Sequence, residues 1–387
     1  MKTVGIVAEY NPFHTGHAWH IAQTRQIFPE EIAVAAVMSG NWVQRGECAV
    51  ADKWARAELA LAGGVDLVLE LPTVWAAASA EGFARGAVSI LAATGVVDVL
   101  SFGSECGELA PLRELARCLS GPEFSSALRR ELGPKQSFAR SRRQAAEALL
   151  GPDKAALLDA PNNSLGVEYL RFLPPGMEAV TVPRRGAGHD SLSERDIFPS
   201  ASLLRQHLRE GEVTSSSPFQ PLSRNGEAAD MRWIERAMLA RLRAMTRPEA
   251  EALPDSGDGL AARLLSAARQ AASLEELYAL TKTRTYTHSR VRRLALRAFL
   301  GLRKQDIPPA PPYLRVLGFN DRGRELLRKI TAPLLVKPAH IRDSARFSPE
   351  AQALFALEER FTDLFALCFP TPRPCGLEWT TDPVMIK

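Results

Sequence analysis

Short apolar segments alternate with helix-forming segments through the first two hundred of the 387 residues. The apolar segments are nearly continuous, which is typical of strands in a parallel sheet that helices cover on both faces. Strand–helix–strand repetition with short connections predicts an open, doubly wound parallel α/β sheet. We expect strands over 4–9, 32–38, 66–71, 97–102 and 180–183, and helices over 17–27, 52–62, 80–94 and 200–209.

The turn between the first predicted strand and the first predicted helix has the sequence His14-Thr15-Gly16-His17. A helix N-terminus presents unpaired N–H groups and a positive dipole end, and both favour phosphate. Imidazoles can donate hydrogen bonds to phosphate oxygens, and Gly16 lets the backbone approach a ligand closely. The turn is typical of Rossmann-like nucleotidylyltransferases, which promote attack on the α-phosphate of ATP by positioning and charge stabilisation. We predict that His14 and His17 are catalytic.

Ligands of doubly wound sheets lie at the carboxyl ends of the strands, and polar residues follow four of the predicted strands. We expect these four ends to converge on one crevice. A second phosphate-binding element is expected late in the same domain, where two hydroxyls open a helix and an arginine follows one turn later; a plain serine N-cap is the alternative. The strand-end residues are His14, Ser39-Gly40-Asn41, Glu70 and Gly103-Ser104-Glu105, and the second element consists of Ser200, Ser202 and Arg205.

Residues 210–227 are rich in Ser, Pro and Gly without periodicity, which indicates a linker. We expect it to separate an ATP-binding domain at 1–209 from a mostly α-helical domain at 228–387. The second domain should be helical almost to its end, with helices over 228–246, 258–270, 273–281, 288–302 and 350–366.

Residues 282–304 are rich in Lys and Arg and contain no acidic residue. Three of the arginines recur at three- and four-residue spacing and so share a helix face. We expect this surface to bind RNA phosphates, with Tyr286 or Trp42 stacking on an unpaired base; a merely solvated helix face is the alternative. The candidate tRNA-binding residues are Lys282, Arg284, Tyr286, Arg290, Arg293 and Arg297.

Composition excludes several classes of protein. The net charge of +4 is too small to make the whole surface a nucleic-acid binder, so an RNA surface must be local. No apolar run reaches the roughly 18 residues of a membrane span, and we expect no membrane partner. Five cysteines without a CxxC pair predict reduced thiols in a cytoplasmic protein. No carboxylate cluster has the spacing of a metal cage, so any Mg²⁺ should arrive with ATP.

An ordered series of motifs resembles the bacterial tRNA(Met) cytidine acetate ligase family. The resemblance begins at Gly5-Ile6-Val7-Ala8-Glu9-Tyr10-Asn11-Pro12-Phe13-His14-Thr15-Gly16-His17 and runs through both predicted domains. The further matching segments are 37–41, 44–47, 53–56, 64–72, 102–105, 161–166, 184–190 and 282–287.

The resemblance implies that acetate attacks the α-phosphate of ATP, giving acetyl-adenylate and pyrophosphate. The acetyl group then passes to N4 of the wobble cytidine of elongator tRNA(Met), forming N4-acetylcytidine. The ATP contacts that it implies are Val7, Ala8, Glu9, Tyr10, Asn11, Pro12, Phe13, His14, Thr15, Gly16, His17, Gly103, Asn162 or Asn163, and Arg184 or Arg185.

The chemistry of these residues agrees with the implied contacts. A glycine lets a base or ribose lie against the backbone, an Asn amide suits an adenine edge, and Arg binds phosphate in a bidentate manner. We expect Ser39, Gln44 and Lys53 to contact acetate or phosphate, and we expect Arg56, one turn from Lys53 on the same helix, to face phosphate or RNA. Two other functions stay open: a small-molecule adenylyltransferase of the pantetheine-phosphate or nicotinate-nucleotide type, and a non-catalytic RNA-binding protein.

Overall fold

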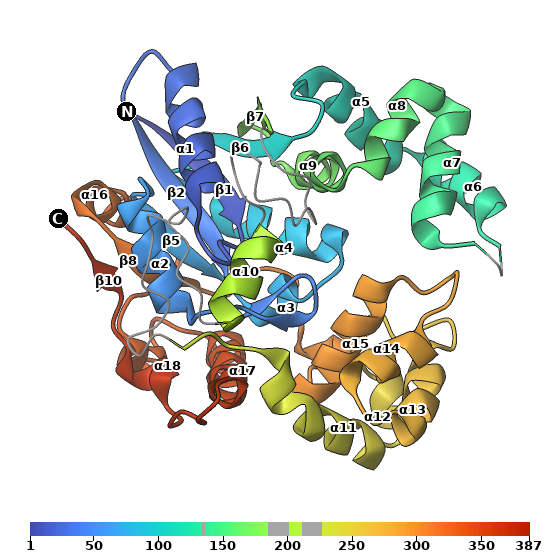
Figure 1. The fold of residues 1–387 in the computed structure, drawn as a ribbon. Coiled ribbons are helices and arrows are strands. Elements are labelled where there is room, and N and C mark those ends of the chain that lie inside the picture. The colour runs from blue at the N-terminus through green and yellow to red at the C-terminus, as the bar shows by residue number, and fades with distance from the viewer. Residues whose placement is uncertain (134–135, 185–200, 211–226) are drawn as a thin grey trace.

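The computed structural model describes residues 1–133, 136–184, 201–210 and 227–387, and it is built around one mixed sheet (Figure 1). The strand order is β10-β8-β5-β2-β1-β6-β7, with β9 paired to β8, and every pairing in this sheet is parallel except β5 with β8. The predicted doubly wound, mainly parallel sheet is confirmed. The strands are β1 (Lys2–Ala8), β2 (Ile32–Ser39), β5 (Leu67–Leu71), β6 (Val99–Ser104), β7 (Glu178–Pro183), β8 (Leu314–Phe319), β9 (Leu334–Leu335) and β10 (Val384–Met385).

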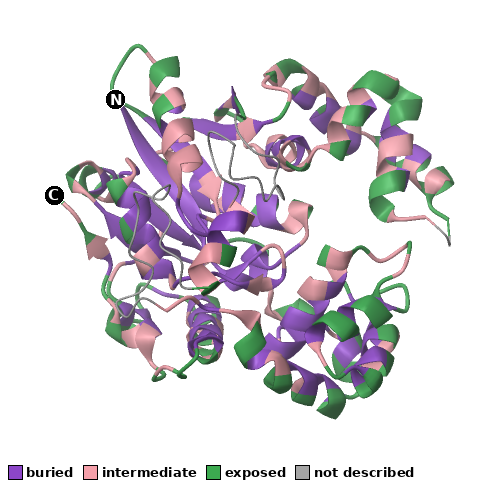
Figure 2. Cartoon of the chain, in the orientation of Figure 1, coloured by how far each residue is buried: buried purple, intermediate pink, exposed green. Residues whose placement is uncertain are grey.

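Both faces of the sheet are apolar, as the continuous hydrophobic runs predict. Along β2, Ala35 and Val37 belong to the core on one face, whereas Val34 and Met38 belong to the core on the other. Helices α1 (Thr15–Ile27) and α2 (Lys53–Ala62) supply side chains to the second core, and α4 (Ala80–Ala93) supplies side chains to the first. Figure 2 shows the central strands buried between these layers.

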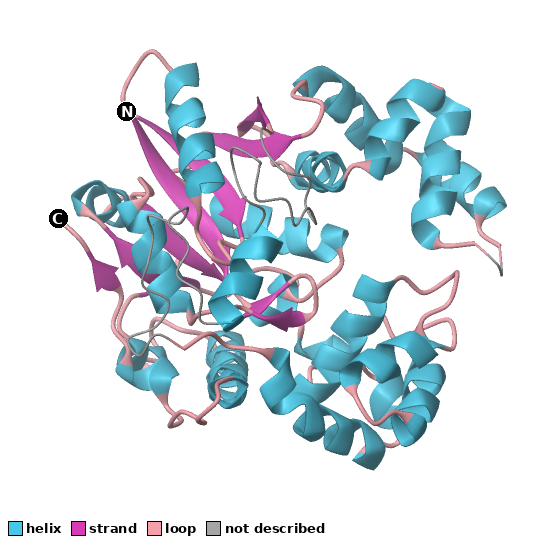
Figure 3. Ribbon diagram, viewed as in Figure 1, coloured by secondary structure: helices cyan, strands magenta, loops and turns pink. Residues whose placement is uncertain are grey.

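Two helical units project from the sheet on the same side of the molecule (Figures 1 and 3). The first, inserted between β6 and β7, contains α5 (Leu109–Ser120), α6 (Pro122–Glu131), α7 (Phe138–Leu150), α8 (Pro152–Ala156) and α9 (Pro161–Phe172). The second, which we call the helical lobe, contains α11 (Glu235–Ala244), α12 (Arg247–Glu251), α13 (Leu260–Gln270), α14 (Leu274–Thr281) and α15 (His288–Leu300). The described helices include none that is long and apolar enough to cross a membrane.

Beyond the helical lobe the chain returns to the sheet, so the expectation that it stays helical almost to its end is wrong. Strand β8 is buried along its whole length, and it holds the polar Arg315 because Glu378 lies opposite. The returning elements are β8, α16 (Asp321–Leu327), β9, α17 (Pro349–Phe365), α18 (Leu377–Thr380) and β10.

The remaining elements lie near the carboxyl edge of the sheet: α3 (Thr73–Ala76), α10 (Ala201–Glu210) and the hairpin of β3 (Trp42–Val43) with β4 (Glu47–Cys48). Arg185, Ser200 and residues 211–226 of the predicted linker lie outside the described residues. The division of the chain into domains at 1–209 and 228–387 stays a prediction.

Candidate active site

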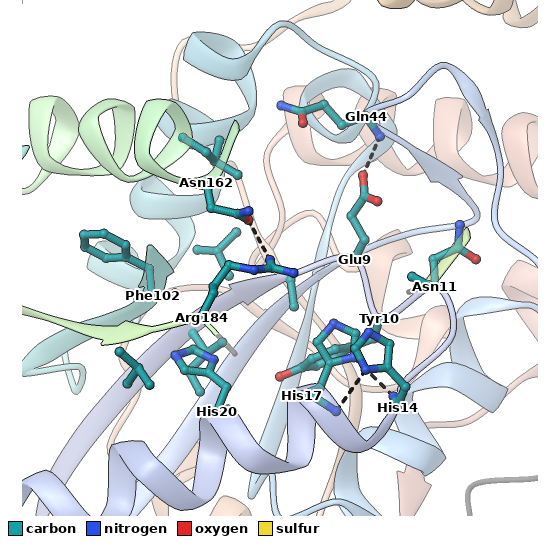
Figure 4. A pocket seen from close by; sticks show the side chains of 18 of the residues that line it. Glu9, Tyr10, Asn11, His14, His17, His20, Gln44, Phe102, Asn162 and Arg184 are labelled. Atoms are coloured by element: carbon teal, nitrogen blue, oxygen red, sulfur yellow. Dashed lines mark hydrogen bonds between the residues drawn. The ribbon is translucent and has the colours of Figure 1, made fainter. Parts of the chain in front are cut away.

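A cavity of about 240 Å³ opens at the carboxyl ends of β1, β6 and β7 (Figure 4). It gathers most of the residues that the sequence nominated for ATP, and it reaches from the first turn to α9 and α10. The nominated residues that line it are Val7, Ala8, Glu9, Tyr10, Asn11, His14, Gly16, His17, Gln44, Gly103, Asn162, Arg184 and Arg205.

The two histidines cap the start of α1 reciprocally. Nδ1 of His14 accepts a hydrogen bond from the Gly16 N–H at 3.0 Å, and Nδ1 of His17 accepts one from the His14 N–H at 3.2 Å. A neutral imidazole whose Nδ1 accepts a hydrogen bond carries its proton on Nε2. Both side chains line the cavity, so this tautomer equips them to donate Nε2–H to an anion there.

The backbone before the histidines is held in an unusual conformation. Tyr10 has a φ of 45°, in the left-handed region that bulky residues rarely adopt. The Asn11 side chain accepts a hydrogen bond from the Val50 N–H at 2.8 Å, and its carbonyl accepts one from Arg205 Nη1 at 2.9 Å. Phe13 is fully buried in the core. Phe13, Pro12 and Thr15 do not line the cavity, so they shape the turn instead of contacting a ligand inside it.

The structure separates the two neighbouring asparagines by role. The Asn162 amide donates to Glu105 at 2.6 Å and accepts from Arg184 at 2.9 Å, and Asn162 lines the cavity. Asn163 is buried and does not line it; its amide oxygen instead accepts the backbone N–H groups of Glu105 and Cys106. Asn162 is therefore the ligand candidate, and Asn163 fixes the loop after β6.

Arg205 comes from α10 and is buried, which lowers the pKa of its guanidinium. The Ser202 hydroxyl accepts a hydrogen bond from Arg205 Nη2 at 3.0 Å. Ser202 itself does not line the cavity.

Several lining residues were missed at the sequence level, among them Trp19, His20, Arg45 and Tyr169. His20 is hydrogen-bonded to the Ser101 hydroxyl at 3.2 Å, and burial and nearby Arg184 lower its pKa to about 4. Its spacing of three residues from His17 on one helix face was a signal that the sequence contained.

The ends of β2 and β5 do not reach the cavity, so the expected convergence of four strand ends is wrong. The Lys53 ammonium is fully buried, 2.7 Å from Glu70 and 2.6 Å from Glu378. These carboxylates raise the pKa of Lys53 although burial alone would lower it. The Lys53 ammonium is thus paired with two carboxylates of the protein itself. This pairing does not fit the expected contact with acetate or phosphate.

Arg56 and Ser39, two more residues that we expected to contact a ligand, are buried and bonded within the protein instead. Arg56 donates to the backbone carbonyls of Glu9, at 2.6 Å, and of Ser39, at 3.0 Å, and its guanidinium is buried. Ser39 is also buried and does not line the cavity. Arg56 therefore ties the ends of β1 and β2 together and cannot meet RNA.

The basic run has no acids in sequence, but several face it in space. Arg297 is buried 2.6 Å from Asp255, and Arg290 lies 3.1 Å from Asp258 and over the Tyr286 ring. We expected Arg290 and Arg297 to offer their charges to RNA phosphates, but both are paired with aspartates of the protein, which corrects that expectation. Arg293 donates to the carbonyl of Gln44 at 3.5 Å, whereas Lys282 and Arg284 are exposed.

The parts of the chain that the structure describes hold no group of three His, Cys, Asp or Glu side chains arranged for a metal ion. The cavity instead offers imidazole, guanidinium and backbone N–H donors, which are groups that bind phosphate oxygens.

A mainly parallel doubly wound sheet with paired histidines at the first helix N-terminus defines a nucleotidyl transferase of the HIGH class. A family model described as HIGH Nucleotidyl Transferase matches residues 1–376. The curated tRNA(Met) cytidine acetate ligases of Syntrophomonas wolfei and Caldanaerobacter subterraneus are 36% and 34% identical to the chain, over 99% and 95% of its length and 99% and 96% of theirs. The chain belongs to the tRNA(Met) cytidine acetate ligase family.

Solved structures agree with this assignment. The apo crystal structure of Thermotoga maritima TmcAL superposes with a TM-score of 0.90 at 31% identity and covers 100% of both chains. The structure of the same protein bound with alpha-thio ATP superposes with a TM-score of 0.86 at 30% identity, also over 100% of both chains.

Proposed function

We propose that this protein is an ATP-dependent tRNA-modifying ligase. It activates acetate as acetyl-adenylate and transfers the acetyl group to N4 of the wobble cytidine of elongator tRNA(Met). The observation that carries the proposal is a cavity with paired histidine donors, in a chain that matches named cytidine acetate ligases over nearly its whole length. The analogue-bound Thermotoga maritima structure supports ATP as the nucleotide. A tRNA substrate places the reaction in the cytoplasm.

In the first half-reaction an acetate oxygen attacks the α-phosphorus of ATP, and pyrophosphate leaves. The Nε2–H groups of His14 and His17 would stabilise the charge that develops on the phosphate oxygens. Arg184, held by Asn162, and Arg205, held by Asn11, would bind the triphosphate from the other walls. Gly103 would let the nucleoside lie against the end of β6, and Arg185 and Ser200 stay candidate contacts. Mg²⁺ would enter bound to ATP.

In the second half-reaction the wobble base must reach the acetyl-adenylate. The helical lobe contacts the cavity wall directly, because Arg293 on α15 donates to the Gln44 carbonyl and Gln44 lines the cavity. Lys282, Arg284 and Tyr286, in the loop before α15, would hold the anticodon arm at this rim.

Pyrophosphate release tests the proposal. The wild-type protein should release pyrophosphate from ATP when acetate is present and should acetylate tRNA(Met) when tRNA is added. The His17→Ala variant should lose both activities, and His340→Ala, which changes an exposed histidine, should keep them. Turnover of ATP with a small-molecule acceptor, without acetate or tRNA, would overturn the assignment.

A further inference from the structure

Glu9 is the only carboxylate among the described residues that line the cavity; the arginines that line the cavity with it are Arg45, Arg184 and Arg205. A fixed carboxylate repels the phosphates of ATP, so Glu9 is poorly suited to binding them. A negative group in a site built for anions calls for another role, and proton transfer is one that carboxylates perform.

Both the backbone and the side chain of Glu9 are held in place. The buried Arg56 guanidinium donates to its carbonyl at 2.6 Å, and the Gln44 N–H donates to Oε1 at 2.8 Å. Within the described residues, no donor is hydrogen-bonded to Oε2. One carboxylate oxygen is thus fixed and the other is available to accept a proton.

Glu9 lies on the side of the cavity that faces the helical lobe. Figure 4 shows its carboxylate turned toward Gln44, with His14 and His17 at the other end of the site. The loop that begins at Gln44 packs tightly on α15, because a Cβ at Gly46 would lie 2.5 Å from the Arg293 nitrogen. A base delivered from the lobe would meet Glu9 on its way to the phosphate end.

Acetyl transfer needs such a proton acceptor. N4 of cytidine forms a C–N bond to the acetyl carbon, the bond from that carbon to the adenylate oxygen breaks, and AMP leaves with the electron pair. The amine must also lose one proton, which N4-acetylcytidine does not retain. Nδ1 of both His14 and His17 already accepts a backbone hydrogen bond, so their cavity-facing nitrogens are donors in the neutral form.

We propose that Glu9 is the general base that takes this proton from N4 onto Oε2 and passes it to water. The inference rests on the proposed function, since it assigns a residue to the second half-reaction. Burial raises the pKa of Glu9, which strengthens it as a base. The charged and titratable groups that interact with Glu9 electrostatically are Arg205, Glu47, Arg45, Arg56 and Tyr169.

The Glu9→Gln variant tests the role, because a glutamine oxygen can still accept the Gln44 N–H while it no longer takes up a proton. Two rates are measured: acetate-dependent pyrophosphate release, and transfer from synthetic acetyl-adenylate to unmodified tRNA(Met). We expect transfer to fall about 100-fold and pyrophosphate release to fall less than tenfold. Glu9→Asp should restore part of the transfer rate, and Glu58→Gln, which changes an exposed glutamate, serves as the control.

The wild-type transfer rate should rise with pH as Glu9 loses its proton, and the Glu9→Gln variant should lack this rise. Equal loss of both rates, or transfer at the wild-type rate, would overturn the role of Glu9 while leaving the ligase assignment intact. Failure of the wild-type protein to transfer acetyl to tRNA would instead overturn the ligase assignment itself.

Discussion

The carboxyl edge of the sheet divides into an open half and a closed half. At the ends of β1, β6 and β7, imidazole and guanidinium groups line a cavity. At the ends of β2 and β5, Lys53, Glu70 and Glu378 form a buried ion cluster beneath α17 and α18. A polar residue at a strand end is therefore a sound candidate for a ligand site only when no ion pair within the protein already engages it.

The closed half depends on distant parts of the chain. Glu378 pairs with both Lys53 and Arg315, and the Thr73 N–H and hydroxyl donate to Glu358 at 2.6 and 2.8 Å. The cluster thereby fastens the C-terminal helices to the ends of β2 and β5. In the open half, Arg184 and Arg205 are instead hydrogen-bonded to neutral groups, the Asn162 amide and the Asn11 carbonyl.

Breaking the closed half should have the largest effect on stability. Lys53→Met removes the ammonium, which leaves the buried Glu70 carboxylate without its ion-pair partner and Glu378 with Arg315 alone. We expect the free energy of unfolding to fall by about 3–5 kcal/mol, measured by denaturant titration. A Lys53→Met protein of normal stability that no longer binds ATP would assign Lys53 to the open half instead.

Substitutions of the histidines in the open half should reduce catalytic activity and leave the fold intact. In His14→Ala and His17→Ala, loss of an Nε2–H donor should slow acetyl-adenylate formation by about 100- to 1000-fold. Unfolding curves should change by no more than the value of a helix cap, about 1 kcal/mol. Parallel losses of stability and rate would make the histidines structural caps only.

The closed half should also respond to pH. Burial, and then Glu70, raise the pKa of Glu358 from its ordinary 4.5 to about 8. Between these values the native state keeps a proton that the unfolded chain loses, so stability should fall as pH rises from 4.5 to 8, by on the order of a few kcal/mol. Glu358→Gln, which stays neutral, should flatten this fall in a thermal-unfolding series. An identical pH dependence in both proteins would contradict the role of Glu358.

The smallest effect should come from the loop before α15. Replacing exposed Lys282 and Arg284 by Ala should weaken tRNA binding by about three- to tenfold and reduce the salt slope of affinity by about 1–2. Arg290→Ala should change binding less than twofold, since Asp258 already pairs with Arg290. Filter binding at several salt concentrations measures both effects. A larger loss of tRNA affinity in Arg290→Ala than in the Lys282 and Arg284 variant would assign the phosphate contact to Arg290 instead.

Most of the fold and part of the site can be predicted from local sequence patterns. The apolar runs of β1 and β2 and the spacing of His14 and His17 are local patterns, so they predict the sheet and its first turn. The occupation of Lys53 by Glu378 is set by tertiary packing and leaves no local signal. Strand β8 was hidden because Arg315 interrupts its apolar run, and the acids opposite α15 lie on other elements.

On the proposed function, the open half joins acetate to ATP and delivers the acetyl group to RNA. Incubating the protein with ATP, isotopically labelled acetate and tRNA(Met), followed by mass analysis of the digested RNA, tests it most directly. We expect one labelled acetyl group on the wobble cytidine, and we expect none when ATP is omitted or when His17→Ala replaces the wild-type protein. Unlabelled tRNA, or tRNA that carries AMP in place of acetyl, would contradict it.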